Sequence, residues 1–343
     1  MTARKITQIP SDPQQAAEFD RAFELLRGLV DWPTADQEFP RRGNAVYITS
    51  VVLWMLVSQR MNPERSLESA VKRLSLTQPD FLPKNKRVIE GTLSEATGGY
   101  SRARKRLPPE AAEWFAQRVS DSLIEATVPS WNGRRVDTVD GTTITLAPVP
   151  ALRRAFPPAS NQHGVNPGRV GVWPVALLVV AHELASGAAL LPTVGAKFGE
   201  HAVSETALVR KQFLQMPADA AIEVRLHEVR IHEKLTLSLV TSLPNSAEES
   251  ADLYHLRGDI ETDISNFKVA LNAEHLESRS VAMFHKELLT SQVAYIVKAE
   301  GVVFWTRNPK NQFRNPKQIR STKFKTTCDR ESLFVNPFSV LFP

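Results

Sequence analysis

Four polar residues between positions 254 and 268 have the types and spacing to hold a metal ion and the phosphates around it. They are Tyr254, Arg257, Glu261 and Lys268. On an α-helix with about 100° per residue they lie within about 60° of one another, beside the apolar face. The carboxylate of Glu261 can hold a divalent cation, with Arg257 and Lys268 binding phosphates on either side. Tyr254 can stack on a base or donate a hydrogen bond to a phosphate.

An ordinary surface helix is the alternative explanation of the same residues. Arg257 and Glu261 are four positions apart, and an ion pair at this spacing is common on exposed helices. The spacing alone leaves the two explanations open.

The pattern Y-x2-R-x3-E-x6-K resembles the signature of the insertion-sequence-four family of DDE transposases, and the four residues match it without a gap. The block 283–291 also resembles the family's C-terminal catalytic segment, and the likeness covers about residues 20–297. The resemblance implies Mg²⁺- or Mn²⁺-dependent cleavage and strand transfer at terminal inverted repeats, with DNA as the partner. It assigns Glu261 to catalysis and metal binding, and the other three residues to DNA and phosphate.

The family's first catalytic aspartate stands in an Asp-Gly-Thr sequence on the first core strand, which Asp140-Gly141-Thr142 resembles. By this resemblance Asp140 is a catalytic residue and a metal ligand with Glu261. Asp137 lies three residues earlier and would point to the other face of the strand. An ordinary aspartate beside a glycine turn is the alternative.

The sequence departs from the family at the second catalytic aspartate. In the family it follows a helix that would correspond to residues 200–216, but positions 217–226 read PADAAIEVRL, and Asp219 falls in a turn before a strand. The interval from Asp219 to Glu261 is also shorter than in the family. We interpret this as an internal deletion of a core strand and most of a β-rich insertion, which leaves the second aspartate unknown.

Three functions therefore remain open at this point. The chain can be an active transposase, or a remnant of one that only binds DNA. A general Mg²⁺ nuclease of the same fold is the third, and the stripe from Tyr254 to Lys268 favours it least. The missing aspartate is the feature that separates the first two.

Apolar residues at helical spacing predict that the first 130 residues are mostly helical. The expected helices cover 14–32, 45–57 and 66–74, and a further helical unit covers 100–126, with Pro108-Pro109 near its middle. Asn62-Pro63 should end the second of them. Basic residues at Arg102, Arg104, Lys105 and Arg106 give the last one a cationic start. The resemblance makes 1–130 a DNA-binding domain, and a plain helical bundle with a solvated basic face is the alternative.

The pattern changes after Trp131 to short stretches that favour strands. The expected strands cover 136–146, 170–182, 189–194, 222–231 and 235–241, and the expected helices cover 200–216, 246–271 and 281–297. This order predicts an α/β (α+β) fold, and three antiparallel strands followed by a helix are how a ribonuclease-H-like fold begins. We expect this core at 131–297 and a poorly ordered basic tail at 298–343.

Composition sets wider limits. The net charge of +5 and pI of about 9.3 suit a polyanionic partner. The lone Cys328 excludes an internal disulfide, and the N-terminal residues lack the apolar stretch of a signal peptide. The longest apolar run, 170–181, is too short to span a bilayer. We expect a cytoplasmic, nucleoid-associated protein, with a homodimer as an optional assembly. His182-Glu183 lacks the second histidine of a zinc-protease motif, and we interpret it as a strand end.

Overall fold

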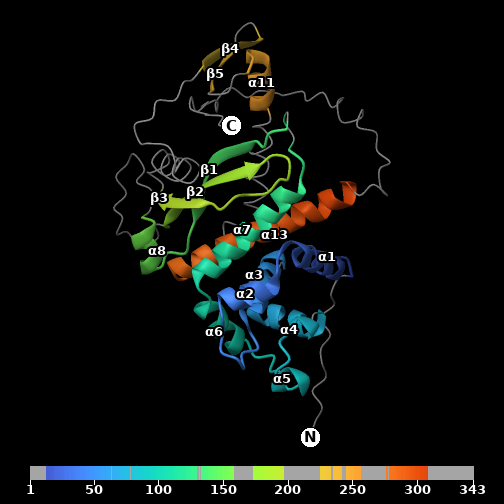
Figure 1. Cartoon of the computed structure of the whole chain (residues 1–343). Coiled ribbons are helices and arrows are strands. Elements are labelled where there is room, and N and C mark those ends of the chain that lie inside the picture. The colour runs from blue at the N-terminus through green and yellow to red at the C-terminus, as the bar shows by residue number, and fades with distance from the viewer. Residues whose placement is uncertain are drawn as a thin grey trace.

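The structure is a computed structural model (Figure 1) that describes residues 13–62, 64–77, 79–129, 131, 133–157, 173–196, 225–232, 235–241, 245–255, 276 and 278–307. The first part is helical and consists of α1 (Pro13–Leu29), α2 (Trp32–Glu38), α3 (Thr49–Met61), α4 (Leu67–Thr77), η1 (Pro79–Phe81), α5 (Lys86–Ile89), α6 (Gly98–Arg106) and α7 (Pro109–Ala126). The second part consists of β1 (Asp137–Thr145), α8 (Pro150–Ala155), β2 (Val175–Glu183), β3 (Thr193–Ala196), β4 (Arg225–His232), β5 (Leu235–Thr241), α11 (Ala247–His255) and α13 (Val281–Arg307).

Helix α3 forms the centre of the helical part because its sequence is apolar on every side. Every residue of 51–57 is at most 2% exposed. Asp36 of α2 holds the start of α3, since its carboxylate accepts hydrogen bonds from the amide of Ser50 at 2.9 Å and from its hydroxyl at 2.7 Å. The helix ends before Asn62, which is extended as expected for a residue that precedes proline. The expected buried helix is confirmed, four residues later in the chain than predicted.

The helical unit expected at 100–126 is confirmed as two helices, α6 and α7, which are separated at Pro108. α6 ends at Arg106 and α7 starts at Pro109, and Pro108 between them is extended with φ −65° and ψ 142°. The ring of Pro109 disfavours a helical conformation in the residue before it. Pro109 itself fits the first turn of α7, where a missing N–H costs no hydrogen bond. The two helices therefore take different directions (Figure 1).

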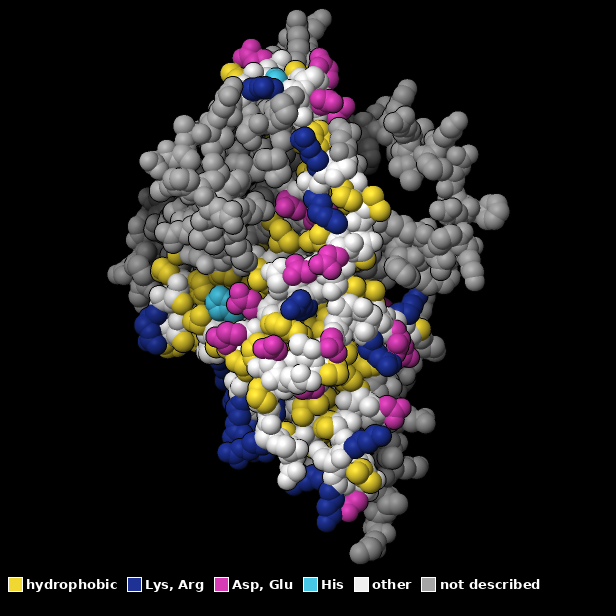
Figure 2. Space-filling model, viewed as in Figure 1, with side chains coloured by type: hydrophobic (Ala, Val, Ile, Leu, Met, Phe, Trp, Pro, Cys, Tyr) yellow, Lys and Arg dark blue, Asp and Glu magenta, His cyan; other side chains and the backbone are white. Residues whose placement is uncertain are grey.

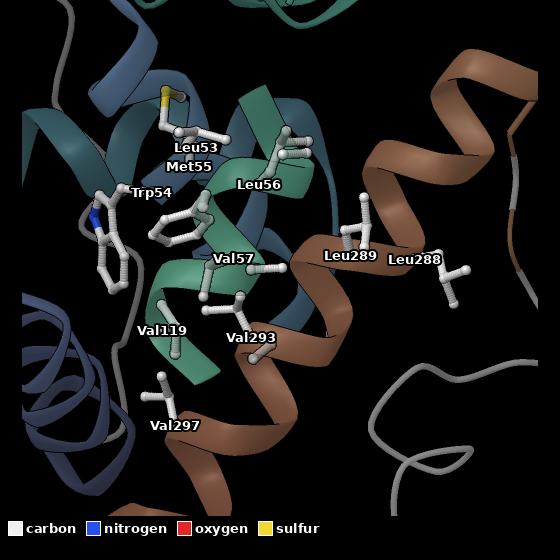
Figure 3. Packing of buried hydrophobic residues seen from close by; sticks show 14 of the residues in the cluster. Leu53, Trp54, Met55, Leu56, Val57, Val119, Leu288, Leu289, Val293 and Val297 are labelled. Atoms are coloured by element: carbon white, nitrogen blue, oxygen red, sulfur yellow. The ribbon is translucent and has the colours of Figure 1, made fainter. Parts of the chain in front are cut away.

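Helices α7 and α13 lie side by side between the sheet and the lower helices (Figure 1). Val119 of α7 packs with Val293 and Val297 of α13 and with Leu56 and Val57 of α3 (Figure 3). All five side chains are at most 2% exposed. Burial of a side chain of this size stabilises the fold by roughly 1.5–3 kcal/mol. The helix from the C-terminal end of the described chain thus completes the core of the first helices.

Helix α13 is longer than the sequence suggested. The expected tail at 298–343 is wrong for its first residues, because α13 continues to Arg307. The apolar run 302–305 follows Lys298 and Glu300 and favours this continuation. Residues 308–343 lie outside the described part of the chain. The division into domains at residues 130 and 297 stays a prediction.

The three strands after the helices form an antiparallel sheet in the order β1-β2-β3. β2 is the middle strand, and from Ala176 onward every residue of it is buried. Its side chains at 176, 178 and 180 join the same core as α7 and α13. The turn expected at Ser186-Gly187 is confirmed, and Gly187 has a φ of +68°, which suits glycine. The strand expected at 136–146 is confirmed as β1 with shorter bounds. The hairpin expected at 170–194 is confirmed as β2 and β3, but its second strand lies at 193–196 and not at 189–194.

A second, two-stranded sheet lies apart from the first. The strands expected at 222–231 and 235–241 are confirmed as β4 and β5, which pair antiparallel, and α11 packs against them (Figure 1). α11 covers the first part of the helix expected at 246–271, and 256–275 lie outside the described residues. The helix expected at 200–216 also lies outside them.

The fold is a mixed helical and antiparallel-sheet structure of the α+β kind, as predicted. The ribonuclease-H-like arrangement stays a prediction, since it depends on the segment after β3. Among the helices that the structure describes, none has both the length and the apolar character needed to cross a membrane.

Candidate functional site

Asp140 lies in the middle of β1, directly opposite Val180 of the central strand. The expected position on a core strand is therefore confirmed for the backbone. Arg257, Glu261 and Lys268 fall in the stretch that the structure does not describe. The convergence of Asp140 with Glu261 stays a prediction.

Tyr254 lies on α11, whose end is attached to the start of β1. The side chain of Leu253 is 3% exposed and packs in a small apolar cluster with Val136, with Trp131 and Leu184 against it. The amide of Leu184 donates a 2.9 Å hydrogen bond to the carbonyl of Val136, which fixes this corner of the sheet. The expected signature helix therefore begins beside the strand that carries Asp140.

The chain returns to the opposite end of β1 after residue 275. Leu276 forms a parallel bridge with Leu146, the residue that follows β1, and its side chain is 3% exposed. The ten residue-to-residue steps from Val136 to Leu146 correspond to about 33 Å of strand. Leu253 and Leu276, which flank residues 256–275 in the sequence, thus lie at opposite ends of the strand that carries Asp140.

His182 and Glu183 form the buried end of β2. Glu183 is 1% exposed, and its carboxylate accepts hydrogen bonds from the amide of Ser186 at 2.8 Å and from its hydroxyl at 2.6 Å. Burial lowers the pKa of His182 to about 4, so this imidazole is neutral at pH 7. The interpretation of this pair as a strand end is confirmed. The carboxylate of Glu183 stabilises the turn that follows β2 by accepting the hydrogen bonds from Ser186. In the described residues no cluster of three or more His, Cys, Asp and Glu side chains could hold a metal ion.

Cationic side chains gather on the outer side of α6 (Figure 2). Arg102, Lys105 and Arg106 are exposed, and Arg42 from the connection before α3 is exposed as well. The half-buried Arg41 donates a 3.1 Å hydrogen bond to the carbonyl of Ala103. Burial and the charge of Arg106 lower the pKa of Arg41, so these two cations lie close enough to repel each other. We call Arg42, Arg102, Lys105 and Arg106 the cationic face.

Beneath the cationic face, α13 carries a buried charged pair. Glu287 is 3% exposed, and its two oxygens bind Arg104 of α6 at 2.8 Å and Arg60 of α3 at 2.9 Å. The hydroxyl of Ser278 also donates a hydrogen bond to Glu287. Lys286 is 1% exposed and donates hydrogen bonds to carbonyls at the end of α6. We call Lys286 and Glu287 the α13 clamp.

A cavity among the first helices is acidic. It has a volume of about 940 Å³ and lies between α1, α2 and η1, and among the described residues that line it the carboxylates outnumber the one cation, Arg27. The carboxylates are those of Asp20, Glu24, Asp36 and Asp80. A polyanion is therefore attracted to the cationic face and repelled from this cavity.

The α13 clamp is the site feature that sequence reasoning missed. The block 283–291 was noted only because it resembles the C-terminal catalytic segment of the transposase family. The available signal was an adjacent Lys-Glu pair inside an otherwise apolar helical stretch, 281–297. Charged residues are almost never fully buried unless paired, so this pair pointed to partners elsewhere in the chain.

A scan against models of known protein families finds no match to the chain, and comparisons with curated proteins and with solved structures find none either.

Proposed function

We propose that the chain is a transposase-type protein that binds DNA at terminal inverted repeats. In this proposal the helical part supplies the DNA-binding surface. The region around β1 and α11 belongs to a site for Mg²⁺-dependent strand cleavage and strand transfer.

The attachment of the signature segment to β1 carries this proposal. Leu253 packs against Val136 at one end of β1, and Leu276 bridges Leu146 at the other. Glu261 lies between Leu253 and Leu276 in the sequence, and the proposal is that it meets Asp140. The cationic face supports the same proposal, because exposed arginine and lysine side chains bind the phosphates of DNA.

Two carboxylates suit the metal that the proposal requires. Mg²⁺ prefers oxygen ligands in octahedral geometry, and Asp140 and Glu261 supply such oxygens. When bound, the metal activates a water or hydroxyl nucleophile and stabilises the leaving oxygen. The part left to the protein is to orient the DNA through Arg257, Lys268 and the cationic face, so that the scissile phosphate lies at the carboxylates.

A DNA-binding remnant is the second candidate, and one sequence observation favours it. Positions 217–226 contain two acidic residues, Asp219 and Glu223, and the only aspartate, Asp219, is predicted to lie in a turn before a strand. Without a second aspartate, a metal ion loses a charged ligand that water replaces poorly. This candidate keeps the DNA-binding surface and loses cleavage.

The experiment measures binding and cleavage on the same DNA. Purified protein is mixed with a short duplex from the DNA that flanks its coding sequence, and with a scrambled duplex of equal length. Preferential binding of the flanking duplex supports the proposal, and equal binding of both sequences contradicts it.

Cleavage then separates the two candidates. Nicking in Mg²⁺ or Mn²⁺ that disappears in Asp140→Asn and Glu261→Gln, but persists in the control Asp137→Asn, identifies an active transposase. Binding without nicking identifies the remnant.

A further inference from the structure

Arg102, Lys105 and Arg106 of the cationic face belong to a helix, α6, that is too short to be stable without contacts to the rest of the fold. α6 has nine residues, and isolated helices of this length are marginal in water. Arg102 and Arg106 are four positions apart and repel each other along the same face. Tyr100 is its only buried side chain. The placement of the cationic face therefore depends on contacts from outside α6.

Lys286 supplies the first such contact, through the backbone. Its ammonium group donates to the carbonyls of Arg104 at 2.7 Å, Lys105 at 3.3 Å and Leu107 at 2.9 Å. The last carbonyls of a helix have no partner within the helix, and a cation there also interacts favourably with the helix dipole. One buried lysine thus fixes the end of α6 on α13.

Glu287 supplies the second contact, through a side chain. It holds the guanidinium of Arg104 inward at 2.8 Å, and the hydroxyl of Tyr100 and Arg104 both donate to Gln59 of α3. Positions 102 and 106 lie about 160° around the helix from position 104. Holding Arg104 inward therefore directs Arg102 and Arg106 outward.

The clamp leaves an excess of positive charge in the folded protein. Arg41, Arg104 and Lys286 crowd together, and Glu287 is the carboxylate among them, with Glu110 as a weaker influence. Burial and the two arginines lower the pKa of Lys286 to about 8. A polyanion bound at α6 relieves this repulsion. A contact that only stabilises the fold does not require an excess of positive charge.

We propose that Lys286 and Glu287 are positioning residues that hold α6 in place and thereby set the affinity of the cationic face for DNA. The inference rests on the proposed DNA binding, and it adds residues that do not touch DNA themselves. It predicts that DNA affinity is controlled from α13.

The test compares Lys286→Met and Glu287→Gln with a control on the same helix. Gln292→Leu is the matched control, because Gln292 donates to the carbonyls of Ala189 and Leu190 beside the sheet, away from α6. Two readouts are taken for each protein. They are amide hydrogen exchange across 98–106 and the dissociation constant for the flanking duplex at several salt concentrations.

Both clamp variants should speed exchange in α6 and weaken DNA binding, each by about tenfold or more, because they remove hydrogen bonds to charged groups. The binding constant should also depend less steeply on the salt concentration, by an amount that corresponds to about one phosphate contact, because the cations lose their common orientation. Gln292→Leu should change neither readout. Circular dichroism shows whether each variant is folded. If one clamp variant fails to fold, the inference is judged from the hydrogen exchange and the DNA affinity of the other.

Two outcomes overturn the inference in distinguishable ways. If wild-type protein binds the duplex and the clamp variants behave like Gln292→Leu, the clamp does not position the cationic face, while the proposed function stands. If wild-type protein binds no DNA, the proposed function is wrong and the inferred control of affinity falls with it.

Discussion

Replacing Lys286 by methionine should change how the stability of the protein depends on pH. The lysine is 1% exposed and its pKa is lowered from 10.5 to about 8, by burial first and then by the charges of Arg104 and Arg41. Between pH 8 and 10.5 the unfolded chain holds a proton on this lysine that the folded chain has released. The free energy of unfolding contributed by Lys286 therefore rises with pH in this window.

The size of the effect follows from the same two pKa values. Each pKa unit corresponds to about 1.36 kcal/mol, and the folded lysine is only half deprotonated at pH 8. From pH 8 to about 9.5, wild-type protein should gain about 1.5 kcal/mol relative to Lys286→Met. The window stops there because tyrosines in the unfolded chain ionise near pH 10, and burial raises the pKa of Tyr100 in the folded one.

Urea denaturation of both proteins at a series of pH values measures this difference. Lys286→Met also leaves three carbonyls without their donor, which lowers stability at every pH, so the informative quantity is the change with pH. A difference that stays constant across the window would show that Lys286 titrates as an ordinary exposed lysine, and the reasoning from burial would be wrong.

Three further changes test the packing and the charges. Phe115→Ala removes a ring that is fully buried against Trp32 and should cost about 3–5 kcal/mol in urea denaturation, and a loss below about 1 kcal/mol would contradict that packing. Gly187→Ala should cost about 1 kcal/mol at its φ of +68°, whereas Gly28→Ala in α1 should be neutral or stabilising, and equal effects would refute the turn geometry. Glu287→Leu should cost about 3–5 kcal/mol, because it leaves the nearly buried Arg60 and Arg104 without a carboxylate; a stability equal to wild type would refute the ion pairs.

Local patterns were sufficient to predict the elements whose environment is set by their own sequence. The apolar stretch that became α3, the run that became β2 and the turn at Ser186-Gly187 each reflect short-range chemistry. The break at Pro108 was also readable in principle, since the second of two adjacent prolines restricts the first.

The site depends on long-range contacts, which a single sequence does not contain. Nothing near Glu287 in the chain indicates that Arg60 and Arg104 are its partners, because they are brought together only when α3, α6 and α13 pack. The same holds for Leu253 and Val136, which belong to different elements. The signature spacing gave candidate residues, and the attachment of their segment to β1 came from the structure alone.

The order of synthesis has a consequence for the helical core. α13 covers the valines of α3 and α7, yet about 180 residues must be made after α7 before α13 is complete. At about 5–20 residues per second, the nascent chain carries that apolar surface uncovered for roughly 10–35 s. A ribosome that stops early would therefore release a helical fragment with exposed apolar side chains. Such a fragment is prone to aggregate, and chaperones bind surfaces of this kind.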